Sequence, residues 1–302
     1  MSGAGSILTE QRNPRSVDID TMTARELVGL INSEDATVAG SVAREGDRIA
    51  AAVDIIVDRL HSGGRLIYVG AGTSGRLCVL DAAECPPTFG TDPEMIVGVI
   101  AGGHGALVRA KEGAEDDRDA GRRDLDLLAA GSADVVMGIA TSGGTPYVQG
   151  ALERAAGVGA GTVFLCCTPV DGDVVPVDVT ITPLTGPEVV TGSTRMKAGT
   201  ATKLVLNTIT TASMVLLGKT YENLMVDLRA TCDKLRDRAC RIMAETTGVD
   251  YDQAVDVLTR AGGSVKAAIV MQKTGVELEE AERLLAEAGG FVREALRRVG
   301  ME

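Results

Sequence analysis

The chain has 302 residues, of which 45% are hydrophobic and 2% aromatic, and its formal net charge is −12 at pH 7. This length is enough to bury a large core, and it suits one large domain joined to a small one. Such an acidic surface does not attract nucleic acid or an anionic membrane, so we expect neither as a partner.

The sequence also indicates a compartment. The N-terminus lacks the basic-then-apolar pattern of a signal peptide, and no run approaches the roughly 20 apolar residues of a membrane span. The six cysteines form no C-x-x-C pair and there are only two histidines, so we expect no metal site. Small buried thiols suit a reducing compartment, and we expect a cytoplasmic protein.

The first part of the chain predicts two helices, a strand and a third helix. Residues 1 to about 20 are polar and irregular. Apolar residues then recur near helical spacing, which predicts a short helix and a longer one. The expected elements are helices over Thr23–Asn32 and Glu34–His61, a strand over Arg65–Gly70, a Gly-rich turn over 71–75 and a helix over Arg76–Ala83.

Four more apolar runs predict further strands, alternating with helical patterns. They lie at Met95–Ile100, Asp134–Ala140, Thr162–Cys167 and Val177–Ile181. Strands that alternate with helices predict an α/β fold, here a three-layer α/β/α domain with a mainly parallel five-stranded sheet. In such a sheet, ligands bind beyond the carboxyl ends of the strands.

The C-terminal third predicts helices only. A long helix is expected over Lys197–Leu217, a charged helix over Leu224–Glu245, and three or four short helices from about Asp250. We therefore predict a large domain over residues 1–246 and a small all-helical domain over residues 247–302.

The glycines after the first strand fit two kinds of site. Gly70, Gly72 and Gly75 spell G-x-G-x-x-G, which suits a dinucleotide. A dinucleotide site also needs an acidic residue at the end of the next strand, but that strand ends in Ala101-Gly102-Gly103. The alternative is a phosphate cradle, because a Gly-rich turn presents N–H groups and hydroxyls at a helix N-terminus.

Two strands are followed by the same tripeptide. Thr73-Ser74-Gly75 follows the first strand and Thr141-Ser142-Gly143 the third. Both turns should therefore lie at one edge of the sheet and offer hydroxyls and amides to one ligand, although ordinary Gly/Ser turns are the alternative. The candidate binding residues are Gly72, Thr73, Ser74, Ser142, Gly143 and Thr145.

A third polar cluster precedes the long helix. Arg195 and Lys197 stand at the start of that helix, where the helix dipole favours acids rather than bases. Their position suits a bound anion, and solvated basic side chains are the alternative. We add Ser193 and Lys197 to the candidate binding residues.

Glu84 lies about three helical turns beyond the first Gly-rich turn. Pro86 and Pro87 follow it and are expected to stop the helix there. An anion cradle and a positioned acid on one helix are the parts of an active site for a phosphorylated substrate.

The sequence resembles the N-acetylmuramic acid 6-phosphate etherase family of the sugar isomerase (SIS) superfamily. The resemblance covers nearly the whole chain, and Glu84 before Cys-Pro-Pro is among its most specific features. The segments that carry it are 8–14, 70–77, 81–88, 100–104, 111–116, 141–146, 186–188 and 192–200.

The resemblance implies a reaction and the residues that perform it. It implies cleavage of the D-lactyl ether of N-acetylmuramic acid 6-phosphate in cytoplasmic cell-wall recycling, without a metal. The proton-donating acid falls on Glu84 and the second active-site carboxyl on Glu115. It also implies a homodimer, and a tail like a small ubiquitin-associated domain.

Elimination is the chemistry that suits these groups. In the open-chain sugar the C1 aldehyde acidifies the C2 proton, and lactate leaves from C3 before water adds. This sequence of steps needs a base, an acid and a phosphate anchor, but no cofactor. Two rival functions use similar turns, a phosphosugar aldose–ketose isomerase and a sugar-phosphate-sensing regulator.

Overall fold

The computed structural model describes residues 7–170, 175–228 and 233–301. Contacts divide the chain into two compact units. The first contains residues 1–83 and 94–210, and the second contains residues 84–93 and 211–302.

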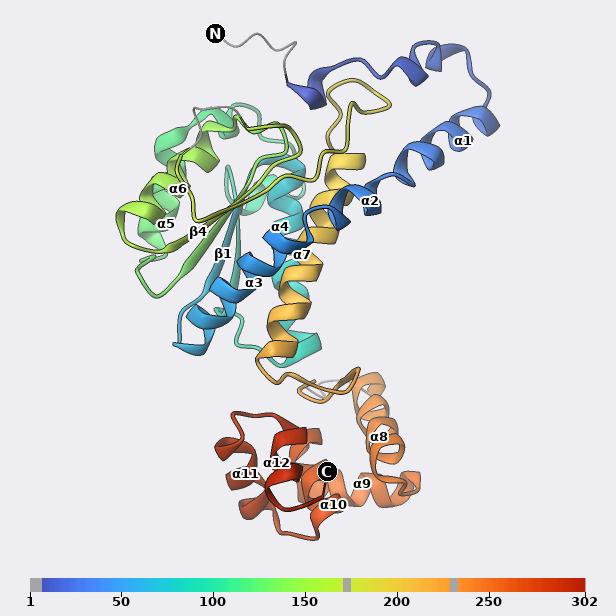
Figure 1. Ribbon diagram of the computed structural model, residues 1–302, viewed down its shortest axis with the longest axis vertical. Coiled ribbons are helices and arrows are strands. Elements are labelled where there is room, and N and C mark those ends of the chain that lie inside the picture. The colour runs from blue at the N-terminus through green and yellow to red at the C-terminus, as the bar shows by residue number, and fades with distance from the viewer. Residues whose placement is uncertain (1–6, 171–174, 229–232, 302) are drawn as a thin grey trace. The chain divides into compact units, whose positions relative to one another are not determined.

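The first unit is built on a five-stranded parallel sheet, as predicted (Figure 1). The strands run in the order β2-β1-β3-β4-β5 and all neighbours are parallel. Their bounds are β1 Leu66–Gly70, β2 Ile96–Ile100, β3 Val135–Ile139, β4 Gly161–Leu165 and β5 Val179–Ile181. The predicted mainly parallel α/β sheet is confirmed.

Helices cover both faces of this sheet (Figure 1). The helices of the first unit are α1 Ala24–Asp35, α2 Val38–Ala43, α3 Gly46–His61, α4 Gly72–Phe89, α5 Arg118–Leu127, α6 Pro146–Gly157 and α7 Lys197–Leu216. The last residues of α4 and of α7 belong to the second unit. Strand alternation builds the two sides of the core. Ile67 and Val69 of β1 pack in one buried cluster with α5 and α6, whereas Tyr68 between them reaches Asp81 of α4.

The predicted long helix over Glu34–His61 is wrong, because it is broken twice. α1 ends at Asp35, and α2 and α3 are separated at Glu45. The N–H of Glu45 bonds to Val42 three residues back, and its carboxylate accepts the N–H of Thr182 at 2.9 Å. A contact with a distant segment thus holds the break, and helical periodicity alone does not reveal it.

The second unit has its own buried core. Its elements are β6 Thr220–Tyr221, β7 Leu224–Met225, α8 Asp233–Thr247, α9 Tyr251–Arg260, α10 Val265–Thr274, α11 Leu278–Glu287 and α12 Val292–Arg298. The predicted helix over Leu224–Glu245 is wrong at its start, because Leu224 belongs to a strand pair and the helix begins at Asp233. Residues 229–232 of that prediction lie outside the described residues. Across the described parts of the chain, no helix is both long and apolar enough to cross a bilayer.

Candidate active site

The two Thr-Ser-Gly turns lie side by side. β1 and β3 are neighbours in the sheet, and Gly70 at the end of β1 is paired with Ile139 at the end of β3. Ser74 is buried, and Ser142 and Thr145 are partly buried. The structure therefore brings together, at one sheet edge, the two turns that the sequence predicted to meet there.

The first of these turns is already helical. α4 begins at Gly72, so Thr73 and Ser74 belong to its first turn rather than to a preceding loop. This start needs glycine at positions 70 and 75, because the two backbones lie close together. A side chain at Gly75 would lie 2.7 Å from the carbonyl oxygen of Gly70 and 2.5 Å from Cγ1 of Ile100.

The second turn also depends on glycine. Gly143 has φ +84°, a left-handed conformation that disfavours other residues. Thr145 then occupies the position before α6, and Pro146 is its first residue. Proline suits that position because its missing N–H would have no partner within the helix.

The third polar cluster approaches the first turn. A side chain added at Gly199 in α7 would lie 3.6 Å from Cγ2 of Thr73. Ser193 precedes α7 and is partly buried, whereas Arg195 is exposed. The start of α7 and the start of α4 are thus neighbours in the first unit.

The N-terminus of α7 is held by an internal carboxylate. Glu188 is fully buried and accepts the N–H groups of Lys197 at 3.0 Å and Ala198 at 2.9 Å. Burial raises the pKa of Glu188, and the two N–H groups and the Lys197 charge oppose that rise. The first N–H groups of α7 are therefore already bonded within the protein.

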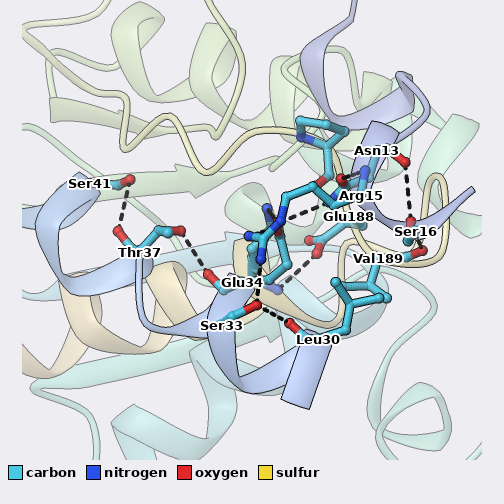
Figure 2. Close-up of polar contacts among 12 residues, drawn as sticks. Asn13, Arg15, Ser16, Leu30, Ser33, Glu34, Thr37, Ser41, Glu188 and Val189 are labelled. Atoms are coloured by element: carbon cyan, nitrogen blue, oxygen red, sulfur yellow. Dashed lines mark hydrogen bonds and ion pairs between the residues drawn. The ribbon is translucent and has the colours of Figure 1, made fainter. Parts of the chain in front are cut away.

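The ammonium group of Lys197 is likewise paired. Its Nζ lies 2.5 Å from Oε2 of Glu34, and both side chains are buried. Glu34 also accepts hydrogen bonds from Asn13 at 2.9 Å and Arg15 at 2.6 Å (Figure 2). Burial alone would raise the pKa of Glu34, but these three donors outweigh it and lower the pKa. Substrate binding by Lys197 stays a prediction, and in this structure its charge is neutralised by Glu34.

The N-terminal segment, predicted to be irregular, packs on the loops that follow β4 and β5. Leu8 donates its N–H to Oγ1 of Thr168 at 3.1 Å, and Ser16 donates its hydroxyl to the carbonyl of Val189 at 2.7 Å. Figure 2 shows Asn13 and Arg15 beside Glu34 and Glu188, and Ser16 beside Val189. The polar composition of residues 1–20 does not predict this packing. The only sequence signal is that segment 8–14 is part of the family resemblance.

A cavity of about 190 Å³ joins the first turn to the second predicted carboxyl. It is lined by Ala71, Gly72, Arg76, Ala101, Ala106 and residues 110–115. Glu115 stands in the short 3₁₀ turn Ala114–Asp116, after β2, and is exposed. Among the candidate residues, Gly72 and Glu115 therefore line one cavity.

A larger hollow of about 800 Å³ lies elsewhere in the first unit, along α3 and β5. Glu45, Arg48 and Asp178 line it, and none of the candidate residues does. The smaller cavity combines the glycine-rich turn with charged side chains, and we take it as the candidate active site.

Glu84 belongs to the second unit and is exposed on α4. The prediction that Pro86 and Pro87 stop the helix is wrong, because α4 continues to Phe89. The two prolines lack the N–H groups that would bond to Ala82 and Ala83, but their carbonyls still accept bonds, as Gly90 N–H shows with Pro86 at 3.0 Å. Glu84 therefore lies within the helix rather than at its end.

Sequence reasoning missed a second carboxyl on α4. Asp81 is buried and accepts hydrogen bonds from Asn207 at 2.5 Å, Thr210 at 3.3 Å and Tyr68 at 3.2 Å. Burial raises its pKa, and these donors and the charge of Lys203 oppose the rise. Asp81 ties α4 to α7 and β1. Its sequence signals are its place three residues before Glu84 and its inclusion in segment 81–88, which carries the family resemblance.

Metal ligands do not gather at this site. Within the described residues, no three His, Cys, Asp or Glu side chains are grouped as a metal ion would require. The expectation that the protein uses no metal stays a prediction.

A parallel sheet with paired polar glycine-rich turns at its carboxyl edge is the arrangement of a sugar isomerase (SIS) domain, and the protein is an α/β protein of that class. Residues 48–156 match the family model described as glucokinase regulatory protein N-terminal SIS domain.

Close relatives then define the family. The chain is 54% identical to the N-acetylmuramic acid 6-phosphate etherase of Rhodopirellula baltica over 88% of each chain. It is 55% identical to that of Salinibacter ruber, over 88% of this chain and 86% of the relative. It is 53% identical to that of Mycolicibacterium smegmatis, over 87% and 88%. The chain belongs to the N-acetylmuramic acid 6-phosphate etherase family.

Proposed function

We propose that this protein cleaves the D-lactyl ether of N-acetylmuramic acid 6-phosphate, a carbon–oxygen lyase reaction that gives N-acetylglucosamine 6-phosphate and D-lactate. One observation carries the proposal: Gly72, from the phosphate-cradle turn, and Glu115, the second carboxyl, line the same cavity. Relatives more than 50% identical bear the name of this activity.

The reaction proceeds by elimination and then addition. A base removes the C2 proton of the open-chain sugar, the C3–oxygen bond breaks, and an acid protonates the departing lactate oxygen. Water then adds across the double bond and restores a hydroxyl at C3. The alkoxide that departs from an alkyl ether is a poor leaving group, so removal of the C2 proton must be accompanied by an acid that protonates the oxygen on C3.

We assign the two proton transfers to Glu84 and Glu115, with Glu84 as the acid for the departing lactate. Their exposure leaves both carboxyls accessible to a substrate. The hydroxyls and amides of the two Thr-Ser-Gly turns hold the 6-phosphate, an arrangement in which a dianion receives many N–H and O–H donors. The turn residues assigned to this binding are Gly72, Thr73, Ser74, Ser142, Gly143 and Thr145. Ser193 and Lys197, from the start of α7, are assigned to it as well, and Lys197 must leave Glu34 to reach the phosphate.

A lactate-release assay tests the function. Purified protein given N-acetylmuramic acid 6-phosphate should release one D-lactate for each N-acetylglucosamine 6-phosphate formed. The unphosphorylated sugar serves as the matched control and should react far more slowly, because the phosphate anchors the substrate. Interconversion of hexose phosphates without lactate would instead support an isomerase, and binding without turnover would support a regulator.

We further propose that the protein acts as a homodimer in the cytoplasm, in the recycling of cell-wall amino sugars. The apolar faces of the N-terminal helices and of α7 support dimer formation, and Val28, Val215 and Leu216 are exposed among the described residues. Light scattering at micromolar concentration should give twice the chain mass of 31.2 kDa. A fully active monomer would contradict this assembly.

A further inference from the structure

The candidate cavity contains two cations that the proposed proton transfers do not use. Arg76 and Lys111 line it together with Glu112 and Glu115. The Nε of Arg76 donates to the carbonyl of Leu107 at 2.9 Å, and Nζ of Lys111 donates to the carbonyl of Gly102 at 3.2 Å. A guanidinium has five N–H donors and an ammonium has three, so each keeps donors for a ligand.

These bonds fix where the cations stand. The stem of Lys111 lies against the turn after β2, since a side chain at Gly102 would come within 2.7 Å of its Cδ. Gly102 has φ +84°, which keeps this turn tight. Arg76 stands on α4, one helical turn beyond Gly72. The two cations are therefore held at the same sheet edge as the Thr-Ser-Gly turns.

The inference rests on the proposed function, whose substrate carries two anionic groups, a phosphate and the carboxylate of its lactyl arm. We propose that Arg76 and Lys111 bind the lactyl carboxylate, while the hydroxyl- and amide-rich turns bind the phosphate. The cavity is lined by two cations and two carboxylates, so the formal charges of its lining cancel. A ligand group with one negative charge is repelled less there than a phosphate, which carries nearly two at neutral pH.

Size and neighbours support the same assignment. Pockets that enclose a whole small molecule measure about 300–1,000 Å³, whereas this cavity of about 190 Å³ fits one arm of a phosphosugar. Glu115 lines the cavity beside the cations, and the lactyl arm is joined to the carbon next to the one that loses its proton. A carboxylate held by Lys111 thus places the breaking bond next to a catalytic carboxyl.

The test compares two substrates, N-acetylmuramic acid 6-phosphate and its analogue with the lactyl carboxyl converted to an amide. Wild-type protein should prefer the acid by roughly tenfold or more in kcat/KM, as expected for a charge-assisted hydrogen bond. Lys111→Gln should lose most of this preference, yet bind N-acetylglucosamine 6-phosphate, which lacks the arm, within about twofold of wild type. Arg109→Gln removes an exposed cation from the same segment that does not line the cavity, and should retain the preference.

Two results would overturn the assignment. The preference for the acid could survive in both Lys111→Gln and Arg76→Gln, in which case neither cation reads the carboxylate. Alternatively, Lys111→Gln could weaken N-acetylglucosamine 6-phosphate as much as the substrate, in which case Lys111 serves the phosphate. Failure of wild-type protein to release any lactate is a separate result that removes the proposed function itself.

Discussion

Glu84 is the residue whose chemistry can be isolated most cleanly, because its side chain is exposed and can change without disturbing a core. We expect Glu84→Gln to lower lactate release by roughly 10²–10⁴-fold, the usual contribution of a positioned general acid. Removal of the C2 proton needs a different group, so exchange of that proton with deuterated solvent should persist. Lactate assays and mass spectrometry of the recovered substrate measure the two activities.

The free energy of unfolding provides the control for Glu84→Gln, and should stay within about 0.5 kcal/mol of wild type. Loss of both activities together would make Glu84 the base as well as the acid. Near-normal lactate release from the folded variant would remove Glu84 from the mechanism.

Asp81 differs from Glu84 because its carboxyl is buried, and it should govern stability rather than proton transfer. Burial raises its folded pKa above the ordinary value of 3.8, so folding favours the protonated form. This contribution to stability is fully present below pH 3.8 and is lost as the pH rises through the raised pKa.

We therefore expect Asp81→Asn, which stays neutral, to lose less stability than wild type between pH 4 and pH 7. Each unit of pKa elevation corresponds to about 1.4 kcal/mol. Urea unfolding of both proteins at several pH values measures the difference in their free energies of unfolding. Burial also raises the pKa of Glu188, but Glu188 is present in both proteins, so its contribution cancels in that difference. Parallel stability curves for the two proteins would show that Asp81 does not titrate in this range.

At the scale of elements, the close approach of α4 to the sheet depends on Gly75. An alanine there would place Cβ 2.5 Å from Ile100 and 2.7 Å from the Gly70 carbonyl, so strand or helix must shift. We expect Gly75→Ala to cost about 1–3 kcal/mol of stability and to weaken phosphosugar binding, because Ser74 moves with the helix start. Gly105→Ala is the matched control, since nothing lies within 4 Å of its added Cβ. Thermal unfolding and titration calorimetry measure both effects, and an unchanged Tm would contradict the packing described.

The elements that obey general rules could be predicted from the sequence. Apolar runs predicted the five strands of the parallel sheet but not the short pair β6 and β7, and the parallel topology placed the two Thr-Ser-Gly turns at one edge. Strands that are connected by helices run parallel, so their carboxyl ends, and the turns that follow them, lie at the same edge of the sheet.

The rest depends on contacts between distant residues. The helix break at Glu45 is held by Thr182, and the charge of Lys197 is neutralised by Glu34, 163 residues away. The role of Asp81 likewise requires Asn207, from another helix. Local sequence patterns predict neither partners that are distant in the sequence nor the burial of the side chains that form these contacts.

At the scale of the whole molecule, the two units divide the chain differently from the predicted boundary between residues 246 and 247. Ile242 and Met243 of α8 are buried in the same core as residues of α9 to α12. A helix that shares this core cannot leave the unit without exposing apolar surface.

Truncation after residue 246 tests which division reflects folding. We expect the shortened chain to bind a hydrophobic dye and to aggregate, because α8 loses the partners that bury Ile242 and Met243. Dye fluorescence and light scattering, compared with the full chain at equal concentration, provide the measurement. A monodisperse truncated protein without dye binding would support the predicted boundary.

The second unit contains residues 84–93 as well as residues 211–302. During translation, residues 84–93 of the second unit are therefore made first, and residues 211–302 of the same unit follow only after residues 94–210. At about 5–20 residues per second this interval is on the order of ten seconds. Throughout it, Asp227, whose backbone lies close to Gly90 in the folded unit, has not yet been made. During synthesis, residues 84–93 are therefore made before strands β2 to β5 and can join residues 211–302 only after the whole α/β sheet has been made.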